Sequence, residues 1–406
     1  MNQPLRLTLT AITAATLTLC FATKSASAQS SSKPFHIGFI TDMTGPYADT
    51  DGAGGLMAIQ MAVEDAGGMA LGQKIEILSA DHQNKADIAA SKTREWIDQQ
   101  DLKMLVGGVN SAAGLAMNSV IASKKRVFIN VAGATSRFTN EDCTPYTISY
   151  EYDTVALANG TGSAIVAQGG KTWFFLVADY AFGASLFNDT SAVIKASGGT
   201  VLGSVKHPPT ANDMSSFLLQ AQASKAQVLG LANAGADTIN SIKAAHDFGI
   251  TKTMKLAALL MTINDVHGLG LPVAQGLMMT DSWYWDKNDA SRKFANRFFL
   301  KMKKMPSTHQ AADYSAVSTY LKAVKAVGTD DADKVMAELK KMKLNDFYAK
   351  GYIRQDGRYI HDMYLMQVKT PAESKKPWDY LKTIATIPGE KAFNTLADSK
   401  CPLIKK

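Results

Sequence analysis

Short apolar runs alternate with segments of helical periodicity along the first two thirds of the chain. The apolar runs predict strands at residues 35–40, 75–79, 104–106, 127–131, 173–177, 201–205, 228–231, 256–258 and 276–279. The helical pattern predicts helices at residues 52–66, 88–100, 115–123, 155–168, 185–196, 215–224, 238–248, 292–305, 314–327 and 333–342. Strands that alternate with helices are typical of parallel sheets covered on both faces. The pattern therefore predicts an α/β protein with doubly wound parallel sheets.

The last third of the chain has a different pattern. Residues 352–360 read as two short strands around the turn at Asp356 and Gly357, a dipeptide that favours hairpins. Pro371, Pro377 and Pro388 interrupt the segment beyond residue 370. We expect residues 371–406 to form a surface tail.

The N-terminus has the features of an export signal. Arg6 precedes an apolar and threonine-rich stretch at residues 7–21, and small residues end at Ala28. This predicts a signal peptide at residues 1–28, cleavage after Ala28 and a periplasmic protein. A lipid anchor at Cys20 is the alternative, but Leu19 is bulky where that processing prefers a small residue.

Cleavage would leave two of the three cysteines, Cys143 and Cys401. An even pair in an oxidising compartment predicts a disulfide. Two separate free thiols are the alternative. A bond would fix the C-terminal segment to the body of the protein.

Composition narrows the possible partners. A chain of 406 residues favours two domains. The formal net charge is +7, and the densest basic patch, residues 301–304, lies on a helix that also carries Phe298 and Phe299. We interpret it as a solvated helix face. Nucleic-acid binding is the alternative, and export argues against it.

No catalytic, cofactor or metal motif is found in the sequence. There is no Gly-x-Ser-x-Gly elbow, no His-Glu-x-x-His and no phosphate-binding loop ending in Gly-Lys-Ser/Thr. The seven histidines lack metal-ligand spacing. Residues 52–55 are similar to a dinucleotide turn, but Met57 stands where the third glycine belongs. We expect no enzyme activity, no cofactor and no metal.

Polar residues follow two predicted strands where a ligand would bind. Ligands of open parallel sheets lie beyond the carboxyl ends of the strands. Asn110 and Ser111 follow the strand at 104–106, and Thr135 follows the strand at 127–131. Hydroxyl and backbone N–H groups near a helix N-terminus suit a carboxylate. The alternatives are a helix cap for Ser111 and a turn hydroxyl for Thr135.

Several segments together match one family in order and spacing. They are residues 37–40, 44–47, 66–68, 71–75, 106–111, 133–135, 179–183 and the helix with Arg292 and Phe294. Over about residues 35–370 the chain resembles the periplasmic substrate-binding proteins of ABC importers, in the leucine/isoleucine/valine-binding branch. The resemblance implies the type I periplasmic binding fold, with two α/β lobes joined by a three-strand hinge. It also implies a monomer that delivers a small solute to membrane permease subunits.

The resemblance implies domain boundaries. The chain would cross between lobes near Tyr152, residues 281–284 and Tyr352. The first lobe would take residues 34–151 and 283–351, and the second lobe residues 152–282 and 352–370.

The resemblance also implies site residues. Positions resembling Ser111, Gly133 and Thr135 hold the ligand carboxylate in the family, and Tyr47 and Tyr180 resemble cleft aromatics, although packing of the lobe surfaces is the alternative for both tyrosines. The predicted ligand-binding residues are Tyr47, Asn110, Ser111, Gly133, Thr135, Tyr152, Tyr180, Phe182, Met261, Trp283 and Trp285.

One departure from the family bears on the ligand. Amino-acid binders place an acidic residue after the seventh or eighth strand, where it pairs with the ligand ammonium. In this chain residues 258–262 contain no acidic residue, and the next one along the sequence is Asp265. An ammonium buried without a counter-charge costs several kcal/mol. With Trp283 and Trp285 near a predicted crossover, this favours an aromatic acid, although both indoles could instead pack the hinge.

Other functions are compatible with the sequence. The same fold could bind a branched-chain amino acid, an amide or urea, and Asp265 in the cleft would favour that alternative. A ligand-sensing module for a membrane receptor is a second alternative. A secreted enzyme on the same scaffold is a third, which the missing motifs disfavour.

Overall fold

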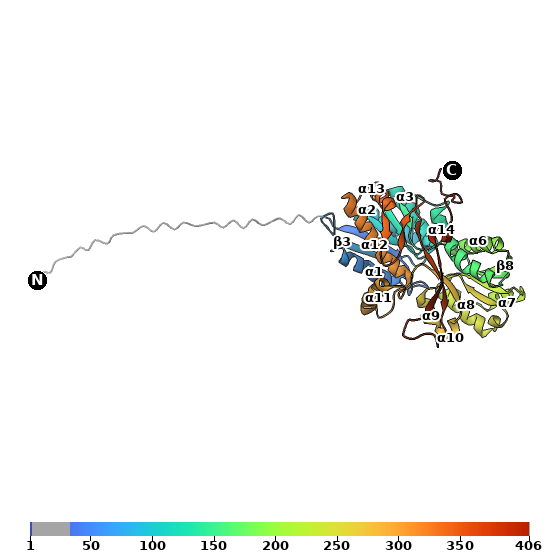
Figure 1. Ribbon diagram of the computed structural model, residues 1–406. Helices are drawn as coiled ribbons and strands as arrows, with labels where there is room; N and C mark the ends of the chain where they lie inside the picture. Colours follow the sequence, from blue (N-terminus) through green and yellow to red (C-terminus); the bar gives the residue numbers. More distant parts are fainter. Residues whose placement is uncertain (2–32, 406) are drawn as a thin grey trace. The chain divides into compact units, whose positions relative to one another are not determined.

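The computed structural model describes Met1 and residues 33–405, and residues 34–406 form one compact unit (Figure 1). The predicted signal sequence, its cleavage after Ala28 and the alternative anchor at Cys20 lie outside the described residues. Two separate parallel sheets, each with its own helices, confirm the predicted α/β fold. We call the six-stranded sheet with its helices the first lobe and the four-stranded sheet with its helices the second lobe.

The first sheet is parallel except for one hairpin strand. Phe35, Ile37 and Phe39 are fully buried in its central strand, as expected for a strand covered on both faces. In spatial order the strands are β2 (Met69–Ala70), β3 (Gln73–Asp81), β1 (Phe35–Thr41), β4 (Met104–Gly107), β5 (Val127–Asn130) and β6 (Thr147–Ser149). β2 pairs with β3 in the antiparallel sense.

Helices from both early and late parts of the sequence cover this sheet. α1 packs on α12, and α2 packs on α3 (Figure 1). The helices are α1 (Gly52–Asp65), α2 (Ala86–Gln100), α3 (Ser111–Lys124), α11 (Asp289–Met302), α12 (Thr308–Val327) and α13 (Ala332–Lys341), with the 3₁₀ turn η1 (Ser136–Thr139) after β5. α12 begins six residues before the predicted start because Ser307 and Gln310 form a capping box.

The second sheet is parallel throughout. Its strands in spatial order are β10 (Lys255–Ala258), β9 (Val228–Ala232), β7 (Thr172–Ala178) and β8 (Thr200–His207). Its helices are α4 (Thr154–Leu157), α5 (Ser163–Ala167), α6 (Ala181–Ala196), α7 (Ser215–Ala223), α8 (Ala236–Asp247), α9 (Ile263–Leu269) and α10 (Leu271–Ala274), with the 3₁₀ turn η3 (Ile250–Lys252) before β10. The helix predicted at 155–168 is interrupted by the π-helical turn η2 (Ala158–Gly162).

Two further small sheets are antiparallel. β11 (Met278–Asp281) pairs with β15 (Met363–Val368), which pairs with β16 (Leu381–Ile387). β12 (Lys343–Asn345), β13 (Lys350–Ile353) and β14 (Tyr359–His361) form the other sheet. The pairing of β13 with β14 confirms the hairpin predicted around Asp356 and Gly357.

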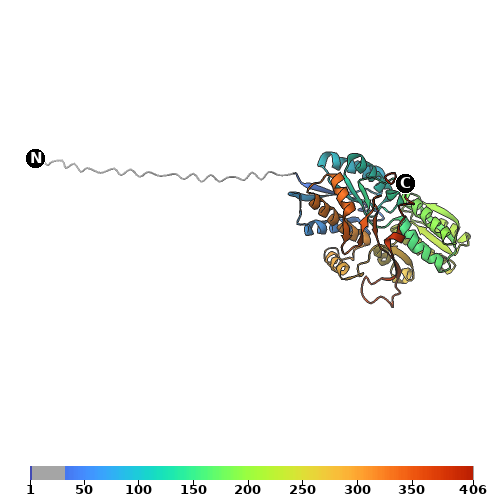
Figure 2. The ribbon, with the colours of Figure 1, turned by 45° about the horizontal axis from the view of Figure 1, so that its top comes forward.

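The segment after residue 370 is more structured than a surface tail. It supplies the edge strand β16 and the short helix α14 (Gly389–Ala392), and Trp378, Phe393 and Cys401 are buried. Both ribbon views place this dark red segment between the two lobes (Figures 1 and 2). The proline-rich pattern concealed the strand because β16 alternates apolar and polar residues weakly, and four of its seven residues are exposed.

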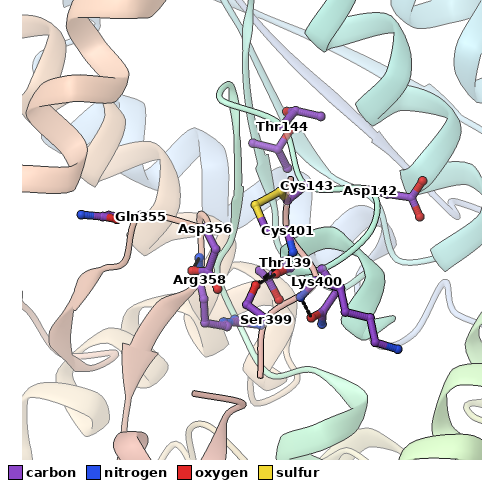
Figure 3. Close-up of a disulfide and its surroundings, with 12 residues drawn as sticks. Thr139, Asp142, Cys143, Thr144, Gln355, Asp356, Arg358, Ser399, Lys400 and Cys401 are labelled. Atoms are coloured by element: carbon purple, nitrogen blue, oxygen red, sulfur yellow. Dashed lines mark hydrogen bonds between the residues drawn. A yellow bond between two sulfur atoms is a disulfide. The ribbon is translucent and has the colours of Figure 1, made fainter. Parts of the chain in front are cut away.

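Cys143 and Cys401 form a disulfide, which confirms the prediction (Figure 3). Their Cα atoms are 5.5 Å apart although 258 positions separate them in sequence. The bond joins the end of the C-terminal segment to the loop that leads to β6.

Candidate functional site

A cavity lies at the seam between the two lobes. Loops from the carboxyl ends of β1, β4, β5 and β6 in the first lobe meet loops from β7, β9 and β10 in the second. The lining residues are Tyr47, Thr50, Val109, Ala132, Ala134, Tyr152, Tyr180, Phe182, Ala234, Gly235, Leu260, Thr262, Asp265 and His309.

Sheet topology explains why the cavity lies at this seam. In the first sheet the chain continues from β1 to β3 on one side and returns to β4 on the other. In the second sheet β7 stands in the same way between β8 and β9. A crevice opens outside the strand ends at such a switch point, because the two following loops run in opposite directions. The switch points of both sheets therefore contribute to one cavity.

Tyrosine side chains close the cavity from both lobes. The hydroxyl groups of Tyr47 and Tyr180 lie 2.7 Å apart and share a hydrogen bond across the seam. Burial raises the pKa of both phenols, so they remain neutral. The enclosed volume is about 20 Å³, which holds one water molecule but no ring. A larger solute therefore requires the lobes to separate or the tyrosines to turn.

Further hydrogen bonds join the lobes beside the cavity. The hydroxyl groups of Thr135 and Ser185 are 2.7 Å apart. Ser136 donates its hydroxyl hydrogen to Asp189 at 2.9 Å. Asn264 donates from Nδ2 to the carbonyl oxygen of Asp49 at 2.9 Å. These contacts, with the tyrosine pair, hold the seam closed.

Gly235 of the second lobe lies against Pro46 and Tyr47 of the first lobe. Its φ is +57°, and a Cβ atom there would lie 2.6 Å from the carbonyl oxygen of Pro46 and 2.9 Å from Cδ1 of Tyr47. Glycine is required both by this left-handed conformation and by the space that the Tyr47 ring occupies.

The structure brings four of the predicted site residues to the cavity wall: Tyr47, Tyr152, Tyr180 and Phe182. Met261 is buried between the lining residues Leu260 and Thr262 but does not line the cavity itself.

The predicted carboxylate residues stand within two sequence positions of lining residues but do not line the cavity themselves. Ser111 Oγ accepts the N–H of Thr135 at 3.2 Å, which ties the loops after β4 and β5 together. Gly133 exchanges two hydrogen bonds with the side chain of Asn130, at 2.8 and 3.2 Å. Asn110 caps α3 by accepting from the N–H groups of Ala112 and Ala113. In this closed arrangement these polar groups are hydrogen-bonded within the first lobe.

The structure places Trp283 and Trp285 away from the cavity. The indole N–H of Trp283 donates to Ser291 Oγ at 3.0 Å, and its ring meets Phe294 and Phe347 edge-on. The indole N–H of Trp285 donates to the carbonyl oxygen of Trp378 at 3.0 Å. Both indoles are buried in packing contacts that satisfy their N–H groups, as buried tryptophans require.

The site residues that the predicted set omitted include one acid, Asp265, and one base, His309. Asp265 belongs to the capping box of α9, where its Oδ2 accepts from the N–H and hydroxyl of Thr262 at 2.7 and 3.0 Å. Burial raises the pKa of its carboxyl group. Its place after β10 was visible in the sequence, whereas His309 comes from the distant helix α12 and had no such signal.

His309 is part of a buried group of ionisable residues. Its Nδ1 lies 2.8 Å from Oε2 of Glu151. Burial alone would lower the pKa of His309, but the charge and hydrogen bond of Glu151 outweigh it and raise the pKa to about 9. Burial, with the nearby charge of Glu151, raises the pKa of Asp281 to about 8. The positive charge of the His309 imidazolium is therefore balanced by Glu151. None of the described residues that line the cavity carries an unpaired positive charge.

These shifts predict that the protein loses stability in mild alkali. A histidine whose pKa rises from 6.5 to about 9 on folding stabilises fully below 6.5 and progressively less as the pH approaches 9. Asp281, raised from 3.8 to about 8, acts in the same direction. We expect the free energy of unfolding to fall by roughly 1–3 kcal/mol between pH 6.5 and 8.5, measured by urea titration.

His309→Gln provides the control for this pH dependence. It removes the titrating ring while keeping a hydrogen-bond donor near Glu151. The slope of stability against pH should become shallower in this variant. An unchanged slope would show that other groups cause the pH dependence.

Neither metal binding nor membrane spanning is indicated by the described residues. In residues 33–405, no group of three or more His, Cys, Asp or Glu side chains is placed to hold a metal ion. Within the same range, the helices are too short or too polar to cross a bilayer.

Comparison with known proteins gives a consistent result. A family model described as "Periplasmic binding protein" matches residues 34–376. A periplasmic binding protein structure from Burkholderia mallei is 67% identical, with a TM-score of 0.91 over 92% of this chain and 100% of the other. A branched-chain amino acid ABC transporter periplasmic ligand-binding protein from Burkholderia xenovorans is 40% identical, with a TM-score of 0.81 over 91% and 99%.

A more distant structure shares the fold. An ABC transporter solute-binding protein from Rhodopseudomonas palustris, in complex with 3,4-dihydroxybenzoic acid, is 20% identical, with a TM-score of 0.80. The alignment covers 88% of this chain and 98% of that protein. At this identity the likeness concerns the fold alone.

Proposed function

Since this chain belongs to the periplasmic binding protein family, we propose that its seam captures a small organic carboxylate, with an aromatic acid as the favoured class. The family membership makes it an extracytoplasmic substrate-binding protein of an ABC transporter and not an enzyme. Such proteins bind a small molecule and interact with membrane permease subunits. The proposal concerns which solute is bound and which residues bind it.

The aromatic lining of the cavity is the observation that carries the proposal. Four rings, those of Tyr47, Tyr152, Tyr180 and Phe182, meet at one small space from both lobes. Aromatic pairs gain about 0.5–1.5 kcal/mol beyond the area they bury. A flat ring that replaces the Tyr47–Tyr180 hydrogen bond would be enclosed by ring faces and edges and could bond to both phenol groups.

Hydroxyl and amide groups from the first lobe would hold the carboxylate. Ser111 and Thr135 lie within two sequence positions of the lining residues Val109 and Ala134, and their loops are already joined by a hydrogen bond. When the lobes separate, Thr135 loses Ser185 as a partner and its hydroxyl can donate to an anion. The N-terminus of α3 adds a favourable partial charge.

An α-amino acid is the second candidate, and Asp265 is the specific observation that favours it. Its carboxyl lines the cavity, where it could pair with a ligand ammonium. The 40% identical protein from B. xenovorans, described as a branched-chain amino acid ABC transporter periplasmic ligand-binding protein, points in the same direction. Two features of Asp265 argue against an amino-acid ligand. One of its carboxyl oxygens already accepts two hydrogen bonds from Thr262, and burial raises the pKa of the carboxyl group. We therefore rank it second.

Capture would proceed by closure of the two lobes. An open form exposes the lining rings to water, and a solute that bridges both lobes favours the closed form through its additional contacts there. A micromolar dissociation constant corresponds to about −8 kcal/mol. One enclosed ring and a hydrogen-bonded carboxylate are of the right size to supply it.

Calorimetric titration against two matched ligand sets tests the choice. One set contains benzoate, 4-hydroxybenzoate and 4-coumarate, and the other contains leucine, isoleucine and phenylalanine. We expect micromolar binding of at least one aromatic acid and weaker binding of leucine. Phenylalanine carries both an aromatic ring and an ammonium group. If it binds more weakly than the aromatic acids, the ammonium group is disfavoured at the site.

Asp265→Asn sharpens the same titration. If the ligand has no ammonium, this variant should bind the aromatic acid as well as the natural protein does. Tight leucine binding that this substitution abolishes would overturn the proposed ligand class in favour of the second candidate.

A further inference from the structure

We infer that residues 388–401, which we call the C-terminal strap, position the loop that carries Thr135 and thereby set how fast a captured solute escapes. The inference rests on the proposed function in one respect, that the solute binds at the seam. The positioning itself concerns residues 135–143, which we call the Thr135 loop.

The end of the strap holds the Thr135 loop at three consecutive residues (Figure 3). The hydroxyl of Ser399 donates to the carbonyl oxygen of Thr139 at 3.1 Å. The N–H of Lys400 donates to Oδ1 of Asn140 at 3.0 Å. Cys401 completes the attachment through its disulfide to Cys143. Two hydrogen bonds and one covalent bond therefore hold the loop from one side.

The start of the strap is attached to the second lobe. Helix α14 packs on α4 and on the π-helical turn η2, the segment that leads into β7. Asn159 of η2 donates from Nδ2 to the carbonyl oxygen of Ala392 at 2.9 Å. A π turn inside a helix often marks a functional position, and here it directs Asn159 towards the strap.

The middle of the strap rests on a buried arginine. The Phe393 ring lies 4.5 Å from the guanidinium carbon of Arg358, and the carbonyl oxygen of Asn394 accepts from Nη1 of Arg354 at 2.6 Å. The strap is thus held along its length and cannot slide freely. It links the second lobe to the Thr135 loop of the first lobe and packs on the β14 segment between them.

The Thr135 loop contributes hydrogen bonds to the seam itself. Thr135 bonds to Ser185 and Ser136 bonds to Asp189, both on α6 of the second lobe. A loop fixed by the strap keeps these hydroxyl groups in position as the lobes open and close. A preformed carboxylate site loses less conformational freedom on binding, and this lowers the dissociation rate.

The disulfide makes this positioning dependent on redox state. Reduction would transfer two electrons and two protons from a dithiol to the bond, giving two free thiols on the chain and an oxidised dithiol. Both cysteines are buried, with exposed fractions of 7% and 4%, so a reductant requires the strap to lift first.

The double variant Cys143→Ala, Cys401→Ala tests the inference. Hydrogen exchange of residues 135–143 should become about tenfold faster or more, while exchange in the strands of both sheets stays slow. Stopped-flow release of 4-hydroxybenzoate and of leucine should accelerate by about tenfold for whichever solute binds, with little change in the association rate.

Val335→Ala serves as the matched control. It leaves a space in the buried face of α13 and lowers global stability without touching the strap. Faster release in both variants would show a general effect of stability and overturn the inference. Unchanged exchange of the Thr135 loop in the cysteine variant would overturn it as well.

Ser399→Ala keeps the disulfide and removes two hydrogen bonds, the one that Ser399 donates to the carbonyl oxygen of Thr139 and the one that it accepts from the N–H of Cys401. We expect a smaller increase in release rate, about two- to fivefold, so the inference is testable even if the cysteine variant does not fold. If neither solute binds the natural protein, the proposed ligand fails. The exchange of residues 135–143 still decides the role of the strap.

Discussion

Thr135→Val is expected to weaken binding of the carboxylate solute by about 10- to 100-fold. Valine has nearly the shape of threonine, so the variant removes a hydroxyl group without creating a space. A hydrogen bond to a charged group contributes about 1.5–3 kcal/mol, and 1.4 kcal/mol is a tenfold change in affinity. Calorimetric titration of the natural protein and the variant with the same solute measures the loss.

Thr139→Val is the matched control for this substitution. Thr139 is also buried and ends η1, four positions beyond Thr135, but its hydroxyl donates to the carbonyl oxygen of Ser136 at 3.4 Å and not across the seam. Its affinity should stay within about twofold of the natural protein. Equal losses in both variants would mean that the loop was disturbed as a whole, and no loss in Thr135→Val would mean that the carboxylate lies elsewhere.

Arg358→Met is expected to lower the free energy of unfolding by about 3–5 kcal/mol, more than the other substitutions considered. The Arg358 side chain is fully buried. Its Nη1 donates to Ser149 Oγ at 2.9 Å and to Asp153 Oδ2 at 3.4 Å, and its Nη2 bonds to the carbonyl oxygen of Glu151. The variant would leave Asp153 buried without a counter-charge. Urea unfolding at pH 7 measures the difference.

Arg297→Met is the control that separates burial from charge. Arg297 pairs with Asp65 through two bonds of 2.8 and 2.9 Å, but its side chain is 41% exposed. Exposed ion pairs contribute at most about 1 kcal/mol. If the two arginine variants lose equal stability, the buried position of Arg358 is not what makes it important.

Much of the fold could be predicted because buried parallel strands appear in the sequence as short apolar runs. β1, β4, β5, β7 and β9 are short, mostly apolar and largely buried. Their carboxyl ends locate the site, so Tyr47, Tyr152, Tyr180 and Phe182 were predicted from position and resemblance and line the cavity. The disulfide followed from the cysteine count and the compartment.

The remaining site residues depend on contacts that local sequence does not encode. Trp283 and Trp285 follow the end of β11 in an irregular segment, where no strand or helix periodicity fixes which way a side chain points. Their direction is set by the carbonyl oxygens of Phe347 and Trp378, 64 and 93 positions away, which accept the indole N–H bonds. His309 reaches the cavity from α12 for the same reason, since its partner Glu151 lies 158 positions away.

The width of the seam could not be predicted either. The Tyr47–Tyr180 bond joins positions separated by 133 residues, and the angle between the lobes decides whether that bond forms. Sequence indicates which side chains face the cavity, whereas its volume depends on how far the lobes have closed.

A crystal structure of the protein with the tightest-binding aromatic acid tests the central claim most directly. The proposed capture mechanism predicts the solute between Tyr47 and Tyr180, with its carboxylate within hydrogen-bond distance of the Thr135 hydroxyl and the phenol–phenol bond broken. A solute bound outside the seam, with the two tyrosines still bonded to each other, would contradict it.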